Sequence, residues 1–142
     1  MSFNYSSKGV QMDNGFSPAP AGVYNCIIRS ITEKTTKNGD PMVSAKCEID
    51  QTGEWLGTVF FHNVTFIGND EQGKPRKGAG MALNFLKHIG EPWEGDFEVS
   101  PDNWVRKTFR AMLKVEKDLK GTPRNQIAYL IDPSVVSDEV PF

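Results

Sequence analysis

Apolar and polar residues alternate along the first half of the chain and predict three β-strands, at 22–36, 42–49 and 55–66. The middle segment carries four residues of one face, Val43, Ala45, Cys47 and Ile49. Such period-2 alternation is typical of a strand that buries one side and exposes the other. Between the first two strands, Asn38-Gly39 supplies two residues that tolerate positive φ. This pair predicts a hairpin turn of the mirror-image type.

The second half of the chain begins with a helical pattern over Ala79–Ile89, whose apolar stripe consists of Ala79, Ala82, Leu83, Leu86 and Ile89. Gly90 and Pro92 follow the stripe and end the helix. Residues 92–105 are ambiguous, with a short helical turn possible at 100–103. Alternation then resumes in two more strands, at 108–116 and 125–131.

The element order is strand, strand, strand, helix, strand, strand, which is the order of the OB-fold, a five-stranded Greek-key barrel. We therefore expect a mainly β OB-fold domain over residues 21–132. Residues 1–20 are rich in Ser, Asn, Gly and Pro and are expected to form a flexible arm, and residues 133–142 an acidic tail. OB-folds bind oligonucleotides on strands 2 and 3 and in the loops after strands 1 and 4, which here are 32–41 and 117–124.

Size and composition favour one globular domain, with 142 residues, 38% hydrophobic and 24% charged. No apolar run approaches the roughly 18 residues of a membrane span, and the N-terminus lacks the apolar core of a secretory signal. We expect a cytoplasmic protein.

Cysteine and histidine placement argues against a disulfide and against a metal site. Cys26 should pair with a residue near 50 across the hairpin rather than with Cys47. Neither these cysteines nor His62 and His88 have the short spacing of a zinc site. We expect no metal and no cofactor.

Binding of single-stranded DNA requires cations that follow the phosphates and aromatic faces that stack on bases. The net charge is only −2, but residues 102–124 carry seven cations against three anions. The candidate cations are Lys34, Lys37, Lys46, Arg76, Lys77, Arg106, Lys107, Arg110, Lys114, Lys117 and Arg124. The candidate stacking groups are Trp55, Phe60, His62 and Tyr129. In the third strand Phe60 and His62 lie opposite Phe61, so one set is exposed. The competing interpretation is that the lysines are solvated surface groups and the aromatics core.

The chain ends in Ser137-Asp138-Glu139-Val140-Pro141-Phe142. This sequence resembles the acidic C-terminal tip of bacterial single-stranded DNA-binding proteins, which recruits replication and repair enzymes. The resemblance implies a partner-binding role for Asp138, Glu139, Val140, Pro141 and Phe142. Phe142 would offer a ring and a carboxylate to one pocket, and the two acids would meet a basic rim.

The body of the chain shows a second resemblance, over residues 16–131. The entry Phe16-Ser-Pro-Ala-Pro-Ala-Gly-Val-Tyr24 and the later Thr36-Lys-Asn-Gly39 are similar to small phage proteins that adopt an OB-fold and bind single-stranded DNA. The resemblance implies a non-enzymatic protein that coats single strands during phage replication, recombination or repair, and that could form homo-oligomers. The alternatives are a small structural or assembly phage protein, and a nuclease using the acids of 91–98.

Overall fold

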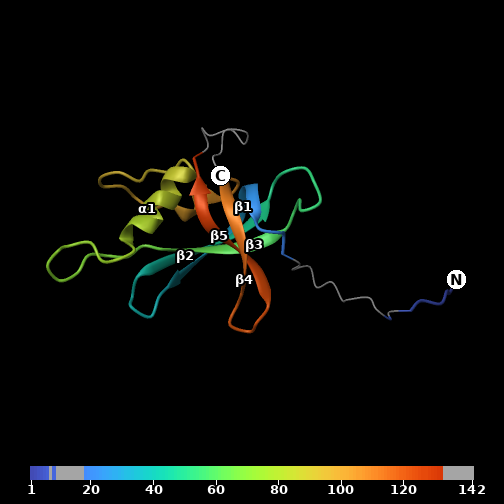
Figure 1. Cartoon of the computed structure of the whole chain (residues 1–142). Helices are drawn as coiled ribbons and strands as arrows, with labels where there is room; N and C mark the ends of the chain where they lie inside the picture. Colours follow the sequence, from blue (N-terminus) through green and yellow to red (C-terminus); the bar gives the residue numbers. More distant parts are fainter. Residues whose placement is uncertain (7, 9–17, 133–142) are drawn as a thin grey trace.

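The structure is a computed structural model that describes residues 1–6, 8 and 18–132. Five antiparallel strands form a single sheet in the order β3-β2-β1-β4-β5 (Figure 1). Their bounds are β1 Gly22–Thr35, β2 Pro41–Ile49, β3 Val59–Thr65, β4 Thr108–Lys117 and β5 Pro123–Ile131. Between β3 and β4 lie the helix α1 (Ala79–His88) and the 3₁₀ turn η1 (Pro101–Trp104). The predicted mainly β fold and element order are confirmed.

The long strand β1 pairs with two neighbours and thereby joins the halves of the sheet. Its start, Gly22–Ile27, pairs with β4, and the segment from Cys26 to Thr35 pairs with β2. A bulge at Arg29 shifts the β1–β2 register between Ile28 and Ser30. Bulges bend a strand and increase its twist. The sheet therefore curls until β3 and β5 approach each other, but no ladder of hydrogen bonds joins these two described strands. The barrel is OB-like and open along this β3–β5 seam.

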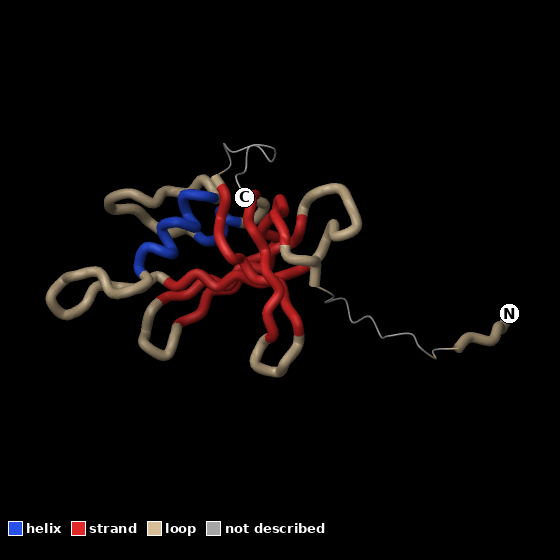
Figure 2. The backbone as a smooth tube through the Cα atoms, in the orientation of Figure 1, coloured by secondary structure: helices blue, strands red, loops and turns tan. Residues whose placement is uncertain are grey.

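The interior is filled by the faces that the alternation predicts, including Val43, Ala45, Cys47 and Ile49 of β2. One end is plugged by α1, which lies beside the sheet in Figure 2. The Phe85 ring of this helix packs at an angle against Trp104 of η1 and edge-on against Phe109 of β4, with ring centroids 5.6 and 5.7 Å apart. Trp104 is fully buried.

The buried stripe of α1 differs from the predicted one. It consists of Ala82, Phe85, Leu86 and Ile89, whereas Leu83 is 38% exposed. Positions 82, 85, 86 and 89 follow the helical i, i+3, i+4, i+7 spacing as well as the predicted set does. The large ring of Phe85 fills the barrel end, and this orients the helix.

The β1–β2 turn also differs from expectation. Gly39 has φ of +85°, but Asn38 is not among the described non-glycine residues with positive φ, so the turn is not of the mirror-image type. Instead, the Gly39 amide donates to the Thr36 carbonyl, and the Thr36 amide donates to the Asp40 carbonyl. This is a type I turn followed by a left-handed glycine, the other common way to close a short hairpin.

The β4–β5 hairpin closes in the same way, with the Gly121 amide donating to Asp118 and the Asp118 amide to Thr122. The Asp118 carboxylate also accepts from the Lys120 and Thr122 amides, at 2.9 Å each. These bonds, that from Thr122 first, lower the pKa of Asp118. Both hairpin tips are therefore held by their own hydrogen bonds and project from the lower side of the sheet in Figure 1.

Asn125 is a buried polar residue, and its side chain holds the segment before β1 against the barrel. Its Oδ1 accepts from the Ala19 amide at 2.8 Å, and its Nδ2 donates to the Ala19 carbonyl at 2.9 Å. Ala19 is itself fully buried. Ala19 and Pro20, whose carbonyl accepts from the Tyr24 hydroxyl, thus contact the folded domain.

We predict that Asn125→Ala lowers the free energy of unfolding by about 2 kcal/mol, because both backbone groups of Ala19 lose their partner in a buried site. Urea unfolding followed by tryptophan fluorescence measures this. The exposed Asn103→Ala is the control and should change stability by less than about 0.5 kcal/mol. Equal effects of the two substitutions would contradict the fastening role.

We predict opposite effects for alanine at two open glycines. Gly39→Ala should destabilise by about 1 kcal/mol, because a Cβ is strained at φ of +85° although nothing lies within 4 Å of it. Gly80→Ala should stabilise by about 0.5–1 kcal/mol, because Gly80 lies within α1 in open space. Thermal unfolding gives both signs, and a stabilising Gly39→Ala would rule out the turn geometry described above.

Candidate nucleic-acid interface

The outer face of β2 and β3 brings a cation and an aromatic ring together. Lys46 of β2 lies directly opposite Phe61 of β3 in the ladder, so the two side chains are cross-strand neighbours on one face. Phe61 is 52% exposed and Lys46 is exposed as well. A flat apolar ring beside an ammonium group matches the base and phosphate of one nucleotide.

Phe60, which we expected to stack on bases, is a core residue. It is 2% exposed and makes an edge contact with Phe109 at 6.4 Å. The strand alternation left two possibilities, and the outward residue is Phe61. A signal was present in the sequence, since Phe60 shares its face with Val64, another large apolar residue of the same strand.

The β4–β5 hairpin borders the outer face of β3. A depression of about 400 Å³ lies between them and is lined by Phe61, Asn63, Arg124 and Gln126, among others. Arg124 is held beside it, with Nε 3.3 Å from the Asp118 carboxylate. Lys117 is exposed where β4 enters the hairpin. Asn63 and Gln126 were not predicted as site residues, since neutral amides carry no recognisable sequence pattern.

The β1–β2 hairpin carries two further predicted cations. Lys34 is exposed on β1, where it pairs with Met42, and Lys37 is exposed in the turn. Counted along the exposed face of β2, Met42 lies four residues from Lys46, so Lys34 borders the same outer surface. The hairpin thus extends the charged face away from the β4–β5 hairpin.

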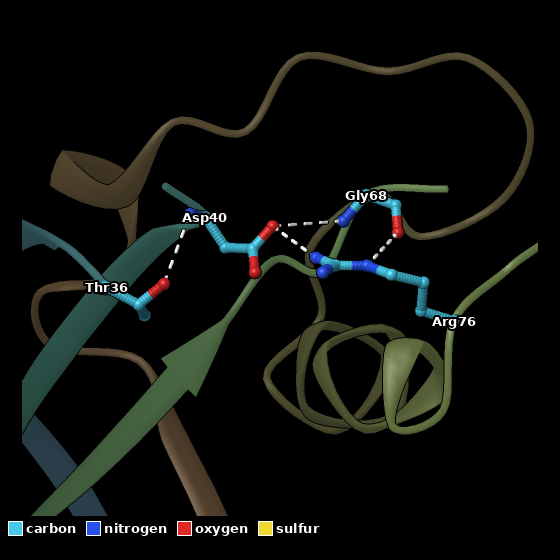
Figure 3. Close-up of polar contacts among 4 residues, drawn as sticks. All are labelled: Thr36, Asp40, Gly68 and Arg76. Carbon is cyan, nitrogen blue, oxygen red and sulfur yellow. Dashed lines mark hydrogen bonds and ion pairs between the residues drawn. The ribbon is translucent and has the colours of Figure 1, made fainter. Parts of the chain in front are cut away.

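Arg76 is a structural cation (Figure 3). Its guanidinium forms an ion pair with Asp40 at the end of the β1–β2 turn, and its Nε donates to the Gly68 carbonyl at 2.9 Å. The Arg76 hydrogen bond is the main cause that lowers the pKa of Asp40. Asp40 also accepts from the Gly68 amide at 3.4 Å. This cluster ties the segment after β3 to the hairpin, and this engagement leaves Arg76 poorly suited to the predicted phosphate contact. Lys77, its neighbour, is exposed.

Four predicted cations lie elsewhere on the barrel. Arg106 and Lys107 flank β1 on the edge opposite to β2, where the Arg106 amide donates to Ile28 at 2.7 Å. The Lys107 ammonium lies 3.8 Å from Glu91. Arg110 and Lys114 project from β4, beside Asn25 of β1 and Gln126 of β5 respectively. The Lys114 ammonium is paired with Glu116 at 2.7 Å. These four residues therefore lie on β4 and just before it, and not on the β2–β3 face that carries Lys46 and Phe61.

Three aromatic candidates differ in their exposure. Trp55 lies in the β2–β3 connection and packs partly against the core. The His62 ring lies 4.8 Å from the Phe85 ring, and burial lowers its pKa to about 4. Tyr129 on β5 is 53% exposed. Of the three, Tyr129 has a free face, while His62 is neutral near pH 7 and faces inward.

A groove of about 310 Å³ runs between β3, β5 and α1. His62, Asn63, Met81, Asn84 and Tyr129 contribute to its walls, which are otherwise mostly aliphatic. It continues the depression beside the β4–β5 hairpin, because Asn63 lines both. Together they follow the open β3–β5 seam, which sequence analysis did not anticipate because an unpaired edge leaves no mark in the alternation.

The predicted partner-binding residues Asp138 to Phe142 lie outside the described residues. Within the described part of the chain, no group of three or more His, Cys, Asp or Glu residues could hold a metal ion. Cys26 pairs with Ile49 in the ladder, as the hairpin register predicted, and both cysteines are free and buried. Burial raises the pKa of Cys26 to about 12. Among residues 1–6, 8 and 18–132, no helix is long and apolar enough to cross a membrane.

A protein family described as DUF669, protein of unknown function, matches residues 3–122. The chain belongs to this family. The DUF669 match spans β1 to β4 and ends inside the β4–β5 turn, so it contains Lys46 and Phe61, while Arg124 and Tyr129 follow it. No curated protein matches the sequence.

We predict that His62 makes the protein less stable in mild acid. Because burial lowers its pKa from the ordinary 6.5 to about 4, the unfolded chain takes up the proton first. The stabilisation is complete above pH 6.5 and is lost as the pH falls toward 4, by up to about 3 kcal/mol in total. Urea midpoints at pH 7, 6 and 5 measure the slope.

The His62→Gln variant should show a flatter pH dependence over the same interval, since glutamine does not titrate. Carboxylates with lowered pKa values, such as Asp40, act at lower pH and are common to both proteins. An unchanged slope in His62→Gln would show that other groups cause the acid sensitivity.

Proposed function

We propose that this protein binds single-stranded DNA with little sequence preference and coats it during phage DNA replication, recombination or repair. The observation that carries the proposal is the Lys46–Phe61 pair on the outer face of β2 and β3. Strands 2 and 3 are the ligand face of OB-folds, and a ring beside a cation is the contact pattern of non-specific single-strand binding.

The surroundings of the pair support the same proposal. Exposed lysines border it at the β1–β2 hairpin, and Arg124 lies in the depression that Phe61 lines. A free base presents a flat face that Phe61 can stack on, whereas the bases of a duplex are already stacked. The proposed role involves no catalysis, and the protein would act in the cytoplasm of a bacterial host.

The C-terminal tip, Asp138 to Phe142, is proposed to recruit replication or recombination proteins. This part of the proposal rests on sequence alone, through the two acids and the terminal Pro141-Phe142. An aromatic ring, two acidic side chains and a stiff proline suit docking of a short peptide into one pocket with a basic rim.

We predict a marked preference of the protein for oligo-dT over duplex DNA, which weakens as salt is raised. Each phosphate neutralised on a single strand contributes about −0.7 to the slope of log K against log salt. Fluorescence anisotropy of a labelled oligonucleotide at two salt concentrations measures both quantities. Absence of binding at low salt would refute the proposal and leave the structural phage protein as the alternative.

We predict that Phe61→Ala weakens oligo-dT binding by about 1–3 kcal/mol, the usual contribution of one stacked base. Phe61→Leu should weaken oligo-dT binding almost as much, because leucine keeps the apolar bulk but has no ring face on which a base can stack. Lys46→Ala should weaken binding and reduce the salt slope. The charge-matched control is Lys87→Ala on α1, where the ammonium covers the Trp93 ring instead. If Lys87→Ala matched Lys46→Ala, binding would not be localised to β2 and β3.

We predict that a chain ending at Val136 keeps or gains affinity for oligo-dT and no longer retains replication proteins from a host extract. The truncation removes the proposed docking peptide without changing any described residue. Loss of DNA binding on truncation would contradict the proposal that the barrel binds DNA and the tail binds partner proteins.

A further inference from the structure

Between β3 and β5, the sheet has two free edges that face each other. β3 pairs with β2 alone and β5 pairs with β4 alone, so each of these described strands has one unpaired side. The groove of about 310 Å³ lies over this seam and is closed on its third side by α1. Sites of this volume accept compact organic groups rather than extended surfaces.

The walls of the groove are suited to a flat, uncharged, polar-edged group. Tyr129, 53% exposed, supplies an aromatic face, and Met81, 75% exposed, supplies a polarisable apolar surface on the opposite wall formed by α1. Hydrogen-bonding groups are present in Asn63 and Asn84. Among the described residues, no lysine, arginine, aspartate or glutamate lines this groove. It therefore offers stacking and neutral hydrogen bonds, and it offers nothing to a phosphate.

One cation lies where the seam continues, the guanidinium of Arg124, and it is paired there with the Asp118 carboxylate at 3.3 Å. Asn63 lines both the groove and the adjoining depression, and the depression contains Arg124 and the exposed Phe61 ring. A neutral groove with an aromatic wall that continues into a depression bearing the Phe61 ring and the Arg124 guanidinium offers surfaces for bases and a donor group for a phosphate. A peptide could pair with the free strand edges, but it would make no use of the aromatic wall beside an arginine.

We propose that the β3–β5 seam is a nucleobase-binding track, in which one unstacked base of the single strand enters the groove against Tyr129. This inference rests on the proposed function and extends it. The strand would leave the Lys46–Phe61 pair, pass Arg124 with a phosphate, and place the next base beside Asn63, between β5 and α1. The open seam is then part of the binding site.

The test compares two ligands, oligo-dT and a chain of the same length built entirely of abasic spacers, with anisotropy titrations of the full protein. Tyr129→Ala should weaken oligo-dT binding at least about fivefold and leave binding of the abasic chain unchanged, because the ring contacts bases only. Tyr129→Phe, which keeps the ring, is the matched control and should stay within about twofold of wild type. Thermal unfolding of each variant verifies the fold.

A second measurement locates the base directly. Oligo-dT substituted with 5-iododeoxyuridine is photocrosslinked to the protein, and the attachment sites are identified by mass spectrometry. Crosslinks to Tyr129 or Met81 support the track. Crosslinks confined to Phe61, together with wild-type affinity of Tyr129→Ala, overturn it and leave the proposed function intact.

Two other outcomes are also decisive. If the wild-type protein binds no oligo-dT, the proposed function and the track both fail. If Tyr129→Ala binds DNA normally but changes the oligomeric state in light scattering, the seam accepts a strand of another copy and the inference is wrong.

Discussion

The double pairing of β1 is the constraint on which the rest of the structure depends. Fourteen residues of one strand form ladders with both β2 and β4, and the bulge at Arg29 turns the strand where one ladder gives way to the other. The two halves of the sheet must therefore face each other. Because β3 and β5 approach without pairing, the inner side chains have to hold the barrel together at the seam.

Aromatic packing around Phe85 joins β3 to β4, the strand that pairs with β5. Phe85 from α1 contacts His62 of β3, Trp104 of η1 and Phe109 of β4, so one ring joins the helix to three other elements. Two polar groups are buried in this cluster. His62 is kept neutral there, and the Trp104 Nε1 has no hydrogen-bond partner among the described residues. The seam is thus stabilised by burial, which leaves its outer surface free for a ligand.

The sequence allowed the fold to be predicted because strand alternation and helix spacing are local patterns. The inward face of β2 and the Cys26 register followed from residues close in the chain. Features that depend on contacts between distant segments could not be predicted. Arg76 looks like any loop cation until the fold places Asp40 beside it, 36 positions away. Asn125 likewise acquires its role only when Ala19 lies against β5.

The charge distribution leaves exposed lysines without an ion pair among the described residues, although the protein as a whole has a net charge of −2. Several arginines and lysines are paired within the fold, as in Arg29 with Glu48 and Arg76 with Asp40. Within the described residues no ion pair involves the exposed Lys34, Lys37, Lys46 or Lys117, and all four lie on β2 or at the two hairpins. A face with so few available cations gains little from phosphates alone. Its affinity for a single strand would depend on the exposed rings of Phe61 and Tyr129, which stack equally well on any base.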